Sequence, residues 1–269
     1  MKASILSQLI TVKSKGGDHP KASSCPVTAT LSVLTFLVIN KIPSGLDKQF
    51  DYIVVSTKNI ADANPTAAEL IEPAVTAGKT VIVLIQNGLN IEKPFFKKYP
   101  NNICLSGISL IGSHETTPGF IEHDDPDRLI VGAFQNPNIA NERQEAEAQK
   151  FVKIYGAGSK TVCTYTDDVP FHRWQKLVYN ACFNTICAIT GLDTGRIRLA
   201  GDTVLNVVRP AMSEIMTAAK ACGVDLPPDI VDRMVNIDPL TIYFRPSMQV
   251  DVERVCLKSK IRVSDANSL

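Results

Sequence analysis

The sequence predicts an α/β fold in which an incomplete doubly wound sheet is followed by an all-helical region. Residues 51–57 and 79–85 are short, continuous apolar runs rich in β-branched side chains, as expected for strands buried on both faces of a parallel sheet. From Phe171 onward the apolar residues recur instead with helical spacing. The chain has 269 residues, 45% of them hydrophobic, which is enough apolar material for one large domain or two small ones.

The segment between the two strand-like runs carries the start and stop signals of a helix. Asn64 can serve as the N-cap, Pro65 takes the first helical position, and Gly78 marks the end. Strand, helix and strand form a β-α-β unit, and the ligands of such sheets lie at the carboxyl ends of the strands. Lys58 and Asn87 fall at these two ends.

The remaining elements alternate up to about residue 165 and are helical after it. Gly156 ends a helix at 141–155, and Gly191 and Gly223 end two later helices. The change in character places a domain boundary near 167–170. Strands are expected at 103–111, 119–123, 128–131 and 160–165, and helices at 171–190, 202–222 and 228–236.

Charge and residue spacing argue against several classes of function. The formal net charge is +1 and no dense basic run occurs, so nucleic acid binding is not expected. The seven cysteines include no C-x-x-C pair, which indicates reduced thiols in a cytoplasmic compartment. The longest apolar stretch, at 27–39, is shorter than the roughly 20 residues that cross a membrane. The four histidines lack metal-ligand spacing, so no metal site is expected.

One predicted helix carries a polar stripe. Lys176, Asn180 and Asn184 recur at every fourth position, and four residues advance only a little more than one helical turn. The flanking residues are apolar. A lysine and two asparagines are costly to bury without partners, so the stripe suggests a polar pocket that a ligand completes. On spacing alone, the alternative that Lys176 is solvated and the asparagines bond to backbone stays open.

The joint arrangement of these motifs resembles the ketopantoate reductase (2-dehydropantoate 2-reductase) family. A Trp-x-Lys-x-x-x-Asn-x-x-x-Asn helix follows one strand that ends in Thr-Lys and another that ends in Gln-Asn-Gly. The resemblance covers about residues 50–251, and the combined spacing is far more specific than any single motif.

The resemblance implies a fold and an activity. The expected fold is an incomplete Rossmann-like dinucleotide-binding domain at 1–168, followed by a helical substrate and dimerisation domain at 169–269 of the 6-phosphogluconate dehydrogenase-like type. The expected reaction is the NADP(H)-dependent reduction of 2-dehydropantoate to pantoate in pantothenate biosynthesis. A small 2-keto acid is thus the implied substrate, and a homodimer fits the same picture.

On the helix, the resemblance assigns a role to each polar residue. Lys176 matches the general acid, which donates a proton to the ketone oxygen as the nicotinamide delivers hydride. Asn180 and Asn184 match the asparagines that hold the substrate. The chemistry suits a lysine, because its charge stabilises the developing alkoxide and burial lowers its pKa toward the working range.

Outside the helix, the resemblance places Lys58 and Asn87 at the cofactor and Ser247 at the substrate. Without it, Gln-Asn-Gly is equally a plain turn and Lys58 a solvated loop lysine. Ser247 belongs to a Pro-Ser-Met-Gln-Val-Asp stretch that is similar to the family's C-terminal Ser-Met-x-x-Asp. Asp251 shares that match, although it could also be an N-cap or a surface carboxylate.

The sequence departs from the family pattern near both ends. No G-x-G-x-x-G motif occurs, although pyrophosphate needs a close backbone approach at a helix N-terminus, so we expect the first β-α-β unit to be missing. Ser259 stands where the family places a glutamate. A shortened or altered gene product is therefore expected. Two alternatives follow: a non-catalytic remnant or dimerisation partner that lacks the nucleotide-binding loop, and a reductase of another 2-keto acid.

Overall fold

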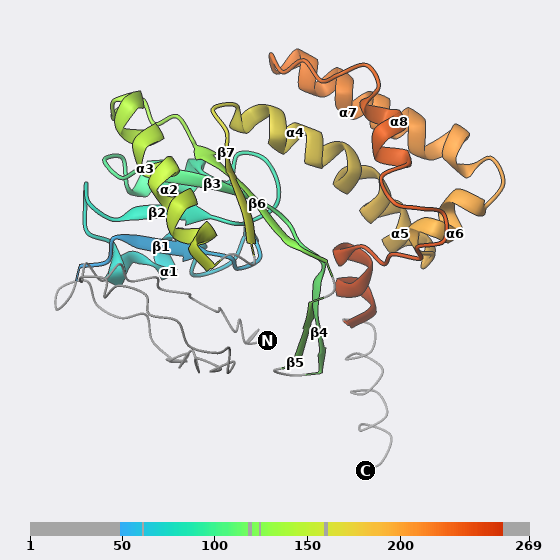
Figure 1. The fold of residues 1–269 in the computed structure, drawn as a ribbon, viewed down its shortest axis with the longest axis horizontal. Coiled ribbons are helices and arrows are strands. Elements are labelled where there is room, and N and C mark those ends of the chain that lie inside the picture. The colour runs from blue at the N-terminus through green and yellow to red at the C-terminus, as the bar shows by residue number, and fades with distance from the viewer. Residues whose placement is uncertain (1–48, 61, 118–119, 124, 159–160, 255–269) are drawn as a thin grey trace, which may run out of the picture. The chain divides into compact units, whose positions relative to one another are not determined.

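The computed structural model describes residues 49–254, apart from 61, 118–119, 124 and 159–160. The chain divides between Val169 and Pro170 into two compact units. The first is a mixed α/β unit and the second is helical, which confirms the predicted fold class (Figure 1). Within the described part of the chain, no helix is both long and apolar enough to cross a bilayer. The apolar stretch at 27–39 and Ser259 lie outside the described residues.

A mixed five-stranded sheet forms the centre of the first unit. Its strands run in the order β1-β2-β3-β6-β7. The pairs β1–β2, β2–β3 and β6–β7 are parallel, whereas β3 and β6 are antiparallel. A separate two-stranded ribbon consists of β4 and β5. The strands are β1 Tyr52–Val55, β2 Val81–Leu84, β3 Cys104–Leu110, β4 Ser113–Thr117, β5 Phe120–His123, β6 Asp127–Ala133 and β7 Thr161–Tyr165.

The two faces of this sheet are covered by different helices, which explains the continuous apolar runs. Successive strand residues point to opposite faces, so Ile53 and Val55 pack in one cluster and Tyr52 and Val54 in the other. The first cluster includes Phe95 from α2 (Lys93–Lys98). The second includes residues of α3 (Asn141–Tyr155). The expected strands and the helix at 141–155 are therefore confirmed.

The helix expected from Asn64 to Gly78 is wrong in both its start and its length. α1 spans only Ala67–Leu70 and is followed by a 3-10 helix, η1, at Glu72–Ala74. Its N-cap is Thr66, whose side chain accepts from the Glu69 backbone N–H while the Glu69 carboxylate accepts from the Thr66 N–H at 2.8 Å. This reciprocal capping box outweighs the Asn64 signal. Pro73 lacks an N–H and clashes with the preceding turn, so the α-helix stops before it.

The second unit is built from helices around its own core. Two predicted helix ends are confirmed, because Gly191 and Gly223 adopt the left-handed conformation, with φ of 72° and 80°. Two helices contain π-helical turns, η3 and η4, where a regular α-helix was predicted. The elements are α4 Val169–Tyr179, η3 Asn180–Asn184, α5 Thr185–Thr190, α6 Thr194–Leu199, η4 Val204–Val208, α7 Arg209–Ala221 and α8 Ile230–Val235, and residues 247–254 are also helical.

A buried amide holds the start of α3 in the first unit. Gln144 is fully buried, and its Oε1 accepts from the Asn136 N–H at 2.9 Å. Its Nε2 donates to the carbonyl oxygens of Asn136 and Ile139 at 3.0 and 2.8 Å. One side chain thus satisfies three backbone groups of the loop that enters the helix.

We expect Gln144→Met to lower the free energy of unfolding by on the order of 2–3 kcal/mol, because it leaves these buried backbone groups without a partner. Urea unfolding of the two proteins measures the difference. Gln149→Met changes an exposed residue of the same helix and serves as the control, with an expected effect within about 0.5 kcal/mol. Equal effects of the two substitutions would contradict this role for Gln144.

Candidate active site

The predicted polar stripe lies on the helix that opens the second unit. Lys176 is in the last turn of α4, and Asn180 and Asn184 are the first and last residues of η3. The other side of the same helix supplies Val178 and Phe183 to the core. Asn184 is only 7% exposed, whereas Asn180 and Lys176 are partly buried. The stripe therefore borders a packed core and is not a fully solvated surface.

The π-helical turn differs from the regular helix predicted at 171–190, yet it keeps the polar stripe on one side. An i→i+5 turn takes up more residues than an α-turn, so four residues advance close to one full turn. Asn180 and Asn184 are thus kept near one line along the helix. Single π-turns inside α-helices occur often at functional sites, which agrees with the position of this one.

The electrostatic setting of Lys176 favours proton donation. Burial lowers the pKa of the Lys176 ammonium to about 8, and the positive charge of Arg173 acts in the same direction. Arg173 lies three residues earlier on the same helix and is 6% exposed. An ammonium with this pKa remains mainly protonated at neutral pH, yet it gives up its proton more readily than an ordinary lysine. The arrangement suits a general acid.

In the first unit, the structure brings Lys58 and Asn87 to the same edge of the sheet. Val55 and Leu84, the last residues of β1 and β2, are paired in register. Lys58 follows Val55 by three residues, and Asn87 follows Leu84 by three residues. The turn after β2 is tied across the edge, because Gln86 Nε2 donates to the Thr57 carbonyl oxygen at 2.9 Å. Lys58 and Asn87 are both exposed. The expected location at parallel strand ends is thus observed.

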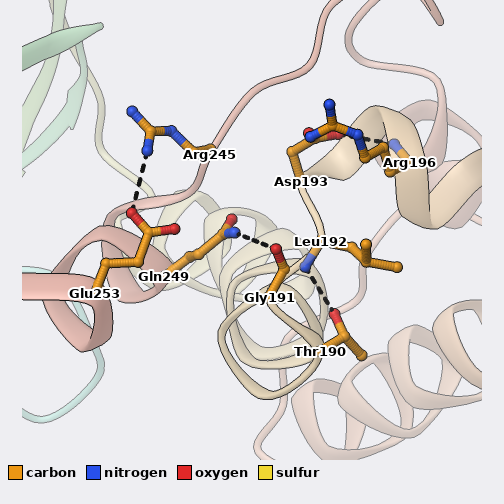
Figure 2. A network of polar contacts seen from close by, with 8 residues as sticks. All are labelled: Thr190, Gly191, Leu192, Asp193, Arg196, Arg245, Gln249 and Glu253. Atoms are coloured by element: carbon orange, nitrogen blue, oxygen red, sulfur yellow. Dashed lines mark hydrogen bonds and ion pairs between the residues drawn. The ribbon is translucent and has the colours of Figure 1, made fainter. Parts of the chain in front are cut away.

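Ser247 begins the helix at 247–254 and is exposed, whereas Gln249 is 3% exposed. The Gln249 Nε2 donates to the Gly191 carbonyl oxygen at 3.0 Å, which connects this helix to the end of α5 (Figure 2). Asp251 is partly buried in the same helix. No pattern in the sequence predicts the contact between Gln249 and Gly191, since the two residues are 58 positions apart.

The candidate residues therefore form two groups. Lys58 and Asn87 belong to the first unit, and the stripe and Ser247 belong to the second. The first group provides two polar side chains at the carboxyl ends of neighbouring parallel strands, where a dinucleotide binds in sheets of this kind. The described residues do not include a glycine-rich turn that would hold the pyrophosphate.

Comparison with known proteins decides the family. The family model "Ketopantoate reductase PanE/ApbA" matches residues 5–136, and the model of the C-terminal domain of the same family matches residues 169–255. The chain belongs to the ketopantoate reductase family. The match begins well before residue 50, so the likeness to this family extends further toward the N-terminus than the motifs alone indicated.

Relatives of known sequence and structure agree with this assignment. An uncharacterised protein of Saccharomyces cerevisiae is 34% identical over 84% of this chain and 70% of its own length. The 2-dehydropantoate 2-reductase of Methylococcus capsulatus is 32% identical with a TM-score of 0.65, over 77% of this chain and 63% of its own. The corresponding structure from Geobacter metallireducens is 26% identical with a TM-score of 0.68, over 79% and 67%. The chain thus spans about two thirds of the length of these ketopantoate reductases.

The fold is also shared with a different reductase. D-mandelate dehydrogenase in complex with NADH has a TM-score of 0.65 over 77% of this chain and 66% of its own, at 18% sequence identity. Since the identity is low, this likeness concerns the fold alone. These three solved relatives are oxidoreductases by name.

The lowered pKa of Lys176 predicts a pH-dependent stability. Between the folded pKa near 8 and the unfolded pKa near 10.4, the unfolded chain binds the extra proton, so stability rises with pH in this window. Below it, both states are charged and the folded state bears the cost of burial. We expect Lys176→Met to stabilise the protein at pH 7 by about 1–3 kcal/mol, with the gain shrinking toward pH 10.

Urea unfolding at pH 7 and pH 9.5 tests this expectation. Lys220→Met replaces an exposed lysine in α7 of the same unit and is the matched control. Its stability change should stay within about 0.5 kcal/mol at both pH values. If Lys176→Met lowers the free energy of unfolding at pH 7, then burial of the Lys176 ammonium does not destabilise the folded state, and the expectation is wrong.

Proposed function

We propose that this protein is an NADPH-dependent reductase of 2-dehydropantoate, which it converts to pantoate in pantothenate biosynthesis. The single observation that carries the proposal is the partly buried Lys176, with a pKa lowered to about 8, on the same helix face as Asn180 and Asn184. Membership of the ketopantoate reductase family supplies the reaction class. A 24% identical protein of a Nostoc species carries the name 2-dehydropantoate 2-reductase, which supports the choice of substrate.

In the proposed reaction, Lys176 acts on the oxygen of the substrate ketone. NADPH, when bound, supplies the hydride that adds to the carbonyl carbon. As the carbonyl π electrons move onto oxygen, the Lys176 Nζ donates its proton to that oxygen, and the lysine regains a proton from solvent. Its positive charge stabilises the developing alkoxide before the transfer. The product is a 2-hydroxy acid.

Asn180, Asn184 and Ser247 are proposed to hold the substrate, and Lys58 and Asn87 to contact the cofactor. The amide and hydroxyl groups provide donors and acceptors for a carboxylate and a hydroxyl group. Lys58 and Asn87 follow the carboxyl ends of two paired parallel strands, which supports the cofactor assignment because dinucleotides bind at such strand ends. We propose NADPH as the cofactor because of the family resemblance. D-mandelate dehydrogenase, which has a similar fold, forms a complex with NADH.

The proposal includes a homodimer in a cytoplasmic compartment. A ketopantoate reductase of Staphylococcus aureus with this fold is dimeric, at 17% identity. The five described cysteines are free thiols, in agreement with a reducing environment. Burial raises the pKa of the Cys182 and Cys187 thiols to about 11, which makes them unreactive core residues.

A non-catalytic partner that cannot bind the dinucleotide is the second candidate. It is favoured by one observation, the absence of G-x-G-x-x-G from the 269-residue sequence. NADPH fluorescence titration separates the two candidates. Micromolar binding supports the reductase, and no binding supports the partner.

Lys176→Ala tests the reductase directly. We expect it to reduce kcat with 2-dehydropantoate by about 10²–10⁴-fold, because a general acid contributes this much to the rate, while NADPH affinity stays unchanged. Steady-state assays of NADPH consumption and the fluorescence titration measure the two effects. Lys220→Ala, at an exposed position of α7, is the control and should retain full turnover. A loss below about fivefold in Lys176→Ala would exclude the proton-donor role.

A further inference from the structure

A short connection follows the helix that carries the polar stripe. α5 ends at Thr190, Gly191 takes the left-handed conformation, and α6 starts at Thr194. Asp193 is 2% exposed and caps α6, since its side chain accepts from the Arg196 N–H at 2.8 Å. We call residues 191–195 the α5–α6 joint (Figure 2).

The segment that leads into the helix at 247–254 lies directly against this joint. The Thr194 N–H donates to the Phe244 carbonyl oxygen at 3.0 Å. A side chain at Gly195 would place its Cβ 2.8 Å from the Tyr243 ring and 2.9 Å from the Ile242 carbonyl oxygen, so only glycine permits this approach. The backbone on both sides is thus held in close contact before the helix begins.

Gln249 continues this contact from within the helix. Its Nε2 donates to the Gly191 carbonyl oxygen at 3.0 Å, and its side chain is almost fully buried. Among the residues that the structure describes, no donor reaches its buried Oε1. Burying an amide of which only one half is paired costs free energy, so stability alone would favour an apolar residue at this position. A role beyond packing accounts better for a glutamine.

We call the hydrogen bond between Gln249 and Gly191 the tether. Within the helix at 247–254, the tether and the candidate substrate residues lie on different sides. Residues two positions apart differ by about 200° around an α-helix, so Ser247 lies nearly opposite Gln249. Asp251, four positions after Ser247, shares its face. The exposure agrees, because Ser247 is exposed and Gln249 is buried. Anchoring one face at the joint therefore orients the other.

We propose that Gln249 is a positioning residue, whose hydrogen bond to Gly191 fixes the orientation of Ser247 relative to the helix that carries Lys176 and Asn184. The inference rests on the proposed function for the role of Ser247. The mechanical link is short: Gly191 directly follows the helix of the stripe, seven residues after Asn184. Small displacements of groups that hold a substrate have large effects on binding and rate, so one such bond is sufficient to matter.

The test compares Gln249→Leu with the wild-type chain in two measurements. Leucine retains apolar volume but has no donor, so the amides of 247–254 should exchange about 3–10-fold faster, while those of 173–190 stay unchanged. The KM for 2-dehydropantoate should rise by a similar factor, with kcat and the Kd of NADPH within about twofold. Val252→Ala, at a 43% exposed position of the same helix, is the control for both readouts.

A second variant distinguishes the loss of the hydrogen bond from misfolding caused by the leucine substitution. Gln249→Glu keeps the side-chain length and replaces the donor by a carboxylate oxygen, which repels the Gly191 carbonyl, so it should have the same two effects. Unchanged exchange at 247–254 in a folded variant would overturn the tether. Faster exchange with an unchanged KM, or faster exchange across 173–190 as well, would overturn the positioning role. If the wild-type chain does not turn over 2-dehydropantoate, the proposed function fails, whereas the exchange measurement still decides the tether.

Discussion

Burial of the Lys176 ammonium beside a packed helical core is the constraint on which the candidate site depends. The same helix must present Val178 and Phe183 to the core and the polar stripe to the other side. Burial and the nearby Arg173 charge lower the pKa of Lys176, so the folded state bears a cost that an apolar residue would avoid. Such a cost is usual where a protein keeps a group for its chemistry and not for its stability.

The first unit meets a different constraint, which is the alignment of two strand ends. The parallel register of β1 and β2 brings Lys58 and Asn87 to one edge, and Gln86 fixes the turn by bonding to Thr57. Both faces of these strands are covered by apolar clusters, so a shift in register would misplace whole rows of side chains. The rigidity of the buried sheet therefore sets the position of exposed polar residues at its edge.

Much of this organisation could be predicted from local patterns. The strands β1 and β2, the helix at 141–155 and the glycine stop at Gly191 follow from apolar runs and from helix-ending chemistry, which act over a few residues. The helix after β1 was mispredicted, because Thr66 forms a capping box that competes with the Asn64 signal. A pattern of fourth-position residues does not distinguish a π-helical turn from a regular helix, so η3 was missed as well.

The contacts that were not predictable are those between distant parts of the chain. Gln249 and Gly191 are brought together by the packing of the second unit, and neither residue type indicates the other. The antiparallel pairing of β6 with β3 is likewise determined by tertiary packing, since a buried apolar strand can pair in either direction. The family resemblance could identify the polar residues and predict that burial lowers the pKa of Lys176, whereas the contribution of the Arg173 charge is known only from the structure.

The pH dependence of kcat/KM for 2-dehydropantoate, measured at saturating NADPH, tests the central claim most directly. At saturating NADPH this parameter reports the ionisation of the enzyme–NADPH complex and of the free keto acid, and a general acid must be protonated to act. With Lys176 as the donor, kcat/KM should be constant at neutral pH and fall tenfold per pH unit above about pH 8. A profile that stays flat beyond pH 10, or a lack of turnover at every pH, would contradict the account.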